Sequence, residues 1–174
     1  MSKPSRATEP KVSYDGTRTF FVATGTAGSR ALLQTERMAN LFIEVLRSYM
    51  KAGKFVIHEF VVMPNHIHLL MTIPQNQTLE QSMQLIKGSF SFRASKELGF
   101  KGETWNRGFS DVQVHDEQSF TRHRSYIGMN PVRAGLCNLP EVYPFGSVYL
   151  KRKKLAGAKA QTEESVIGTT EVVP

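Results

Sequence analysis

The stretch KFVIHEFVVMPNHIHLLMTI (Lys54–Ile73) holds two runs rich in β-branched and aromatic residues, separated by a Pro-Asn pair. Such runs predict two strands, Lys54–Met63 and His66–Ile73, and Pro64 with Asn65 supplies a tight turn between them. We therefore predict a β-hairpin with two histidines near the start of its second strand.

Amphipathic helices are predicted on both sides of this hairpin. Apolar residues at helical spacing predict a helix over Thr35–Ala52, which Gly53 ends. After the hairpin, the segment TLEQ (Thr78–Gln81) has the form of a capping box, so a second helix is expected from there to about residue 99. The residues expected on the buried faces of the two helices are Met38, Leu41, Phe42, Val45, Leu46, Tyr49, Leu79, Met83, Ile86 and Phe90.

Two further strands and a third helix complete the body. RTFFVATGT (Arg18–Thr26) predicts the first strand, and Arg107–His115 predicts the fourth. Asp116 is the expected N-cap of the third helix, which should end at about Asn130, before Pro131. The order β-α-β-β-α-β plus a helix predicts an α+β fold with a ferredoxin-like or RRM-like antiparallel sheet. Two helices would cover one face of the sheet, and the third helix is available for the other.

Length and composition suit one domain with tails. Residues 1–15 are expected to be flexible, the domain to span residues 16–150, and residues 151–174, basic and then of low complexity, to be disordered. We expect no signal peptide and no membrane span. The lone Cys137 forms no internal disulfide, which favours a reducing cytoplasm. The net charge of +7 is typical of chains that meet a polyanion, although many basic proteins bind no nucleic acid.

One residue separates His66 from His68, so both side chains point to the same face of the predicted strand. Their Cβ atoms are expected roughly 6–7 Å apart, close enough to share one metal ion. For an isolated His-x-His pair, histidines satisfied by hydrogen bonds are the commoner explanation. A third ligand is available in Asn130, because it shares a face of the third helix with Tyr126. Taken alone, that tyrosine is better explained as a core residue.

Four separated segments, MPNHIHLL, TWNRGF, SYIGMNPVRAGL and YPFGS, resemble in kind and order the single-tyrosine transposases of the HUH superfamily. The REP-associated tyrosine transposases, a bacterial branch linked to repetitive palindromic DNA, are the most similar. The resemblance spans about residues 17–147. It implies a ferredoxin-like sheet, a catalytic Mg²⁺ or Mn²⁺ ion held by His66, His68 and Asn130, and Tyr126 as the nucleophile.

The resemblance also implies an enzyme that cleaves and rejoins single-stranded DNA at hairpins. Tyr126 would attack the scissile phosphate, giving a 5′-phosphotyrosine and a free 3′-OH, and rejoining would reverse this step. A free tyrosine has a pKa near 10, so a metal ion that polarises the phosphate would assist the attack. Because one phosphodiester replaces another, no nucleotide cofactor is expected, and the sequence contains no GxxxxGK[ST] motif.

Cations that neutralise phosphates and aromatic rings that stack on unpaired bases are the candidates for gripping the DNA. The predicted DNA-binding residues are Lys87, Arg93, Trp105, Arg107, Arg122, Arg124 and Arg133. Trp105 is explained equally well as a core residue. His123 is either a proton acceptor for the phenol or a surface residue, and the second interpretation is the simpler. Gly128 stands where many relatives have a bulky residue, and Gly inside a helix costs roughly 1 kcal/mol relative to Ala.

Two other functions stay open. One is a non-catalytic nucleic-acid-binding module on an RRM-like scaffold. The other is a metal-dependent hydrolase in which Asp111, Asp116 or Glu117 assists a bound water. The sequence does not decide between a monomer and a homodimer, but the short link between the fourth strand and the third helix favours a site built within one chain. The expected location is the bacterial cytoplasm, at the nucleoid when the protein is bound to DNA.

Overall fold

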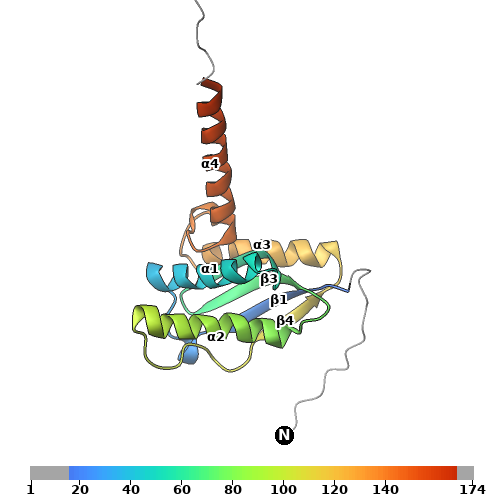
Figure 1. The fold of residues 1–174 in the computed structure, drawn as a ribbon, viewed down its shortest axis with the longest axis vertical. Coiled ribbons are helices and arrows are strands. Elements are labelled where there is room, and N and C mark those ends of the chain that lie inside the picture. Colours follow the sequence, from blue (N-terminus) through green and yellow to red (C-terminus); the bar gives the residue numbers. More distant parts are fainter. Residues whose placement is uncertain (1–15, 168–174) are drawn as a thin grey trace, which may run out of the picture.

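The structure of the protein, a computed structural model, describes residues 16–167, with side chains through residue 159. A four-stranded antiparallel sheet in the order β2-β3-β1-β4 forms its centre (Figure 1). None of the helices in this range is both long and apolar enough to cross a lipid bilayer. The elements are β1 (Arg18–Gly25), η1 (Ala27–Ser29), α1 (Glu36–Lys51), β2 (Val56–Met63), β3 (His66–Ile73), α2 (Leu79–Leu98), β4 (Ser110–Val114), α3 (Glu117–Arg133), η2 (Pro140–Val142) and α4 (Ser147–Ile167).

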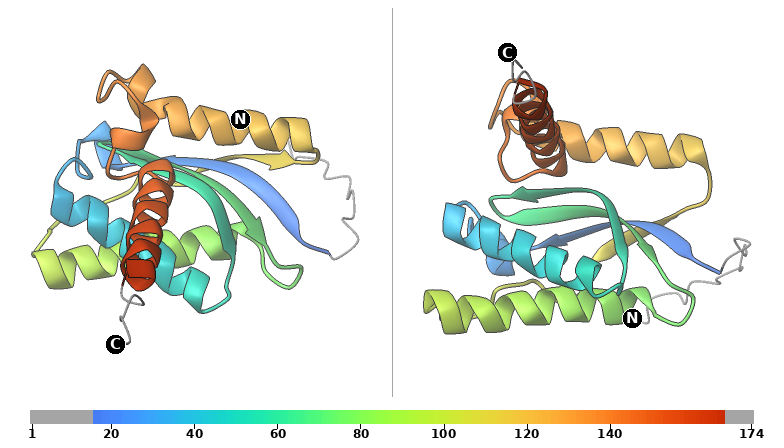
Figure 2. Two further views of the ribbon diagram at one scale, coloured as in Figure 1. Left: turned by 90° about the horizontal axis from the view of Figure 1, so that it is seen from above. Right: turned by 45° about the horizontal axis from the view of Figure 1, so that its top comes forward.

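The sheet separates two layers of helices. Helices α1 and α2 cover one face, and α3 lies across the other, as Figure 2 shows. The larger apolar cluster fills the space between the sheet and the first two helices. The smaller cluster, which packs α3 onto the sheet, is formed by Val61, Met63, Leu70 and Ile127. This arrangement confirms the predicted ferredoxin-like α+β fold, including the third helix on the second face.

The hairpin and the second helix follow their local sequence signals closely. Strand β3 has the predicted bounds, and α2 begins after Thr78 with a complete capping box. The Thr78 hydroxyl accepts the N–H of Gln81 at 3.1 Å, while the Gln81 side chain accepts the N–H of Thr78 at 2.9 Å. Thr35 caps α1 in a simpler way, accepting the N–H of Met38 at 3.3 Å. Short-range signals therefore place these elements correctly.

Two expected boundaries are wrong by three residues each, and β2 begins two residues later than expected, at Val56 instead of Lys54. Strand β4 starts at Ser110 instead of Arg107, because Gly108 has a left-handed φ of +70° that interrupts the extended backbone. Helix α3 runs past Pro131 to Arg133 instead of ending at Asn130. A proline removes one helical N–H and its ring crowds the carbonyl four residues earlier, but the helix continues past Pro131, since the N–H of Ala134 reaches the carbonyl of Asn130 at 3.0 Å.

The C-terminal segment differs from the expectation of a disordered tail. Residues 147–167 form α4, which projects from the body in Figure 1. Lys, Leu, Ala, Gln and Glu dominate this segment, and these are strong helix formers, so propensity supports the helix although residues 151–159 are exposed. The expected flexible segment, residues 1–15, and residues 168–174 lie outside the described residues.

Candidate active site

The two histidines of β3 lie on the sheet face that α3 covers. His66 pairs with Gly25 and His68 with Ala23 across the ladder to β1. Small neighbours leave room above the strands, and the two imidazole rings lie 4.9 Å apart, nearly perpendicular to each other. The predicted common face of the two side chains is confirmed by this contact.

Both imidazoles are kept neutral near pH 7. Burial lowers the pKa of His66, although a side-chain hydrogen bond with Asn130 opposes the shift. Burial lowers the pKa of His68 to about 4, and the neighbouring His66 adds to this effect. A neutral imidazole presents a nitrogen lone pair, which is the form that binds metal ions.

One nitrogen of the pair has no hydrogen-bond partner. The Nδ1 atom of His66 lies 2.7 Å from the Oδ1 atom of Asn65, but Nδ1 of His68 is buried and unpaired. An unpaired buried polar atom costs free energy unless a ligand or water satisfies it. Together with the amide oxygen of Asn130, the two imidazoles form a nitrogen and oxygen donor set that fits a divalent ion. Within residues 16–159, no group of three His, Cys, Asp or Glu side chains offers another such set.

Helix α3 brings the tyrosine to the same place. Asp116 caps the helix by accepting the N–H of Ser119 at 2.6 Å, and Ile127 is fully buried against the sheet. Asn130, 9% exposed, lies beside His66, where its side chain opposes the lowering of the His66 pKa. The ring of Tyr126 stands edge-on to the ring of His68 at 5.4 Å and remains 38% exposed. The predicted ligands and nucleophile therefore gather in one place, with the tyrosine partly exposed.

Phe21 is a site residue that the sequence analysis missed. Its ring stacks on His68 at 5.4 Å and on His123 at 4.5 Å, and it meets the edge of Tyr126 at 5.8 Å. The alternation of side chains along β1 could have identified this residue, because Phe21 pairs with Leu70, whose side chain faces α3. Burial lowers the pKa of His123, and the charge of Arg122 lowers it further, so this imidazole is neutral and able to accept a proton.

Four of the predicted DNA-binding residues lie on α3 or near the His66 end of the sheet. Arg107 and Arg122 are exposed, and Arg133 holds its guanidinium 5.2 Å from the centre of the Tyr126 ring. Arg107 belongs to a loop in which the N–H of Asn106 bonds the carbonyl of Gly25. Arg124 instead pairs with Glu59 at 3.0 Å. For these four residues, DNA contact stays a prediction.

The other three predicted DNA-binding residues lie on or against α2, on the face of the sheet opposite α3. Lys87 donates to the carbonyls of Asn106 and Gly108 at 2.8 and 2.7 Å, and Arg93 pairs with Glu97 and Glu44 at 2.6 and 2.9 Å. Trp105 packs in the core, with ring centroids 5.7 Å from Phe42 and 5.3 Å from Phe90, and its indole N–H bonds the carbonyl of Lys87. The structure does not bring these three residues to Tyr126.

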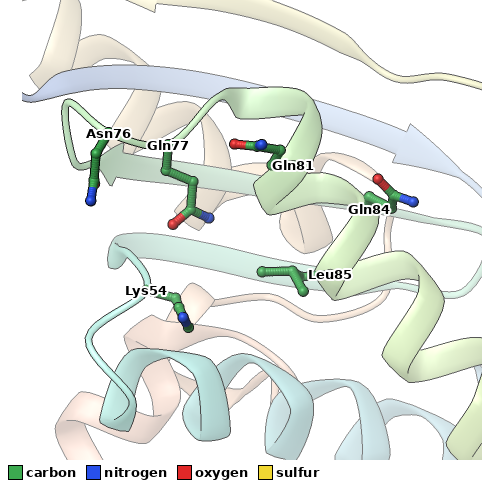
Figure 3. A pocket seen from close by; sticks show the side chains of 6 residues that line it. All are labelled: Lys54, Asn76, Gln77, Gln81, Gln84 and Leu85. Carbon is green, nitrogen blue, oxygen red and sulfur yellow. The ribbon is translucent and has the colours of Figure 1, made fainter.

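A polar cavity of about 550 Å³ lies at the opposite end of the sheet (Figure 3). Two of its amides have local roles, because Gln81 caps α2 and Gln77 donates to Ser82 at 2.8 Å. The cavity holds neither an imidazole nor a carboxylate, so it lacks the groups of a hydrolytic or metal site. Its lining residues are Lys54, Asn76, Gln77, Gln81, Gln84 and Leu85.

Comparisons with known proteins agree with this geometry. The family model described as "Transposase IS200 like" matches residues 22–130, more than half of the chain, including both histidines, the tyrosine and the asparagine. The chain belongs to this transposase family. The membership confirms the resemblance on which the expected chemistry rests.

Two curated relatives and one solved structure are similar to this chain. A protein of Haemophilus influenzae whose name assigns it to the REP-associated tyrosine transposases is 26% identical over 98 residues, 51% of this chain and 56% of the relative. The REP-associated tyrosine transposase of Escherichia coli K12 is 26% identical over 96 residues, 55% of each chain. The chain thus spans about half the length of the curated relatives it matches.

The solved structure is that of a REP-associated tyrosine transposase bound to a REP hairpin. It superimposes with a TM-score of 0.62 at 25% identity, over 86% of this chain and 84% of that one. The similarity extends over most of both chains, and it agrees with the fold described above.

Proposed function

We propose that this transposase cleaves and rejoins single-stranded DNA at the foot of a hairpin, with Tyr126 as the nucleophile. The observation that carries the proposal is the edge-to-face contact of the Tyr126 ring with the His68 ring, at 5.4 Å, on the helix that also brings Asn130 beside His66. A core tyrosine would not need 38% exposure, whereas a nucleophile must be reached by a phosphate.

In the proposed reaction, the Oη atom of Tyr126 attacks the scissile phosphorus in line with the leaving 3′ oxygen. A Tyr–O–P bond forms, the P–O3′ bond breaks, the phenol loses its proton, and the 3′ oxygen gains one. Neutral His123, whose ring stacks on the same Phe21 ring that Tyr126 meets edge-on, is a candidate acceptor for the phenol proton. Because the number of phosphodiester bonds is unchanged, the reverse step can rejoin the strand without an external energy source.

The proposed metal ligands are His66, His68 and Asn130. A bound Mg²⁺ or Mn²⁺ ion would supply charge stabilisation to the phosphate and would orient it toward the phenol. The unpaired Nδ1 of His68 supports this assignment, since a buried ring nitrogen without a hydrogen-bond partner needs a ligand or water to satisfy it. The exposed Tyr126 ring beside the pair leaves a direct approach for DNA.

All four proposed functional side chains come from one chain, which supports a site assembled in cis. Arg107, Arg122 and Arg133 are the proposed phosphate contacts, because they lie near the site and are exposed. The hairpin in the similar solved structure supports the choice of substrate class. The cation-π contact of Arg133 also keeps one positive charge beside the phenol.

The test is incubation of the protein with end-labelled hairpin oligonucleotides, with and without Mn²⁺, followed by a denaturing gel. The expected result is a covalent adduct in the wild type and none in Tyr126→Phe, whose hairpin affinity should be unchanged. Binding without an adduct would favour a non-catalytic nucleic-acid-binding module. Cleavage by Tyr126→Phe would favour a metal-dependent hydrolase.

A further inference from the structure

A buried carboxylate joins three elements on the face that carries the candidate active site. Glu59 of β2 is 2% exposed and follows a register irregularity between Ile57 and Glu59 in the ladder to β3. Its side chain faces α3, because it alternates with Val61, whose partner across the ladder is His68. The reaction proposed above has no use for this acid.

Both carboxylate oxygens have partners from other elements. The Oε2 atom accepts from Nε of Arg124 on α3 and from Nζ of Lys151 on α4, each at 3.0 Å. The Oε1 atom accepts the hydroxyl hydrogen of Ser147, also on α4. The same Lys151 ammonium reaches the carbonyl of His58 at 2.8 Å. Two cations and one hydroxyl therefore compensate the charge that β2 buries.

Arg124 and the catalytic group lie on opposite flanks of α3. At 3.6 residues per turn, Arg124 lies about 60° to one side of Ile127, while Asn130 lies about 60° and Tyr126 about 100° to the other side. Ile127 is fully buried with Val61, Met63 and Leu70 and marks the centre of the contact between α3 and the sheet. A roll of α3 about its own axis moves the residues on both sides of this contact. A roll that releases Arg124 from Glu59 must also move Asn130 and Tyr126.

We propose that Glu59 is a positioning residue that fixes the roll of α3 and so sets the Tyr126 oxygen against the metal site. The inference rests on the proposed function and adds a residue to it. Side-chain ends lie about 5–6 Å from a helix axis, so a roll of about 10° displaces them by about 1 Å. A misplacement of that size can slow a reaction about a hundredfold.

The test compares Glu59→Gln, which keeps the shape of the side chain but removes its charge, with Glu44→Gln as a matched control. Glu44 is an exposed carboxylate on α1, behind the sheet, that also pairs with an arginine. We would measure the single-turnover rate of adduct formation at saturating hairpin with Mn²⁺, and hairpin affinity by fluorescence anisotropy. The expected result for Glu59→Gln is a rate lower by about tenfold to a hundredfold, with an unchanged dissociation constant. Glu44→Gln should match the wild type in both measurements.

Arg124→Gln removes the guanidinium that pairs with Glu59 and leaves Glu59 itself unchanged. It therefore tests the same contact if Glu59→Gln fails to fold. Its rate should fall as in Glu59→Gln, and the double variant should be no slower than either single variant, because residues that act as one unit are not additive. A wild-type rate in Glu59→Gln, or a rate that falls only together with hairpin affinity, would overturn the inference.

A wild type that forms no adduct would refute the proposed function instead, and the positioning role would then be judged without DNA. In that case, hydrogen exchange of the backbone amides of residues 124–130 decides the matter. Faster exchange in Glu59→Gln than in Glu44→Gln supports the role of Glu59, and equal exchange refutes it.

Discussion

Gly128 of α3 lies directly against Val148 of α4: a Cβ atom at position 128 would stand 3.3 Å from the Cγ2 atom of Val148. The absence of a side chain at position 128 thus lets the first turn of α4 approach α3, the helix that carries Tyr126. From the sequence alone, this glycine is expected only to weaken the helix relative to Ala. In the structure, the space is filled by a side chain from a different helix.

Substitutions at Gly128 should separate helix propensity from packing. Gly128→Ala gains up to about 1 kcal/mol of propensity, offset by a contact that Val148 must relieve, so stability should change little. Gly128→Leu overfills the contact and should lower the free energy of unfolding by about 1–3 kcal/mol. Urea denaturation of the two variants measures both effects. Equal stability of Gly128→Leu and the wild type would mean that α4 does not pack here.

Removal of the metal should leave DNA binding but abolish the covalent adduct. Mn²⁺ at 100 times its dissociation constant should stabilise the metal-free wild type by about 2.7 kcal/mol, because only the folded chain presents the site. His68→Gln should lose this stabilisation, whereas the exposed His115→Gln should keep it. Thermal unfolding with and without Mn²⁺ is the measurement, and stabilisation that persists in His68→Gln would contradict the assigned ligands.

The metal-free protein should lose stability as the pH falls below neutrality. His68 has a pKa of about 4 when folded and 6.5 as the ordinary value, so between these values the unfolded chain binds a proton that the folded chain rejects. The contribution is complete above pH 6.5 and is lost toward pH 4, by up to about 3 kcal/mol at 1.36 kcal/mol per pH unit.

Urea denaturation between pH 7 and pH 4 tests this dependence. His68→Gln should flatten the curve, and His115→Gln should not. The remaining slope should come from His58, His66 and His123, whose pKa values are also lowered by burial. An identical slope in His68→Gln and the wild type would show that His68 is not buried as a neutral ring.

Arg107 and Arg93 should differ in their effect on hairpin affinity. Arg107→Gln should weaken binding and reduce the salt dependence by about one phosphate contact, since the residue is exposed beside the site. Arg93→Gln should leave affinity almost unchanged, because its guanidinium is held by Glu97 and Glu44 behind the sheet. Anisotropy titrations at several salt concentrations distinguish the two. A larger loss in Arg93→Gln would place the DNA on the α2 face.

Trp105 should prove to be a stability residue. Trp105→Ala should lower the free energy of unfolding by about 3–5 kcal/mol, because its ring packs between Phe42 and Phe90. Trp105→Phe should retain most of the stability and all of the hairpin affinity. A loss of affinity in the folded Trp105→Phe variant would instead support base stacking.

The features that the sequence predicted correctly depend on residues that are close together in the chain. The capping box at Thr78, the alternation that aligns His66 with His68, and the spacing of Tyr126 and Asn130 on α3 are all properties of short segments. The meeting of β3 and α3 required one further step, the resemblance to a family. Without it, the two histidines and the tyrosine would each have had a simpler explanation.

Contacts between distant segments were the part that sequence could not supply. Glu59 reads as an ordinary exposed position in a strand until Arg124 and Lys151 are found beside it. Trp105 and Arg93 resemble DNA contacts by residue type, and only the layers of the fold put them behind the sheet. The helix end expected before Pro131 is wrong because the preference of the residue before a proline for an extended backbone is weaker than the packing of a helix that is already formed.

The position of Lys151 also changes where this domain can be divided. A boundary after Leu150, drawn from composition, falls inside α4 and one residue before the ammonium that reaches Glu59. A fragment trimmed at that boundary would keep every proposed catalytic and metal-binding residue yet leave the buried acid with one cation fewer. For anyone preparing a shortened chain or a chimaera, the smallest self-sufficient unit must therefore include the opening turns of α4.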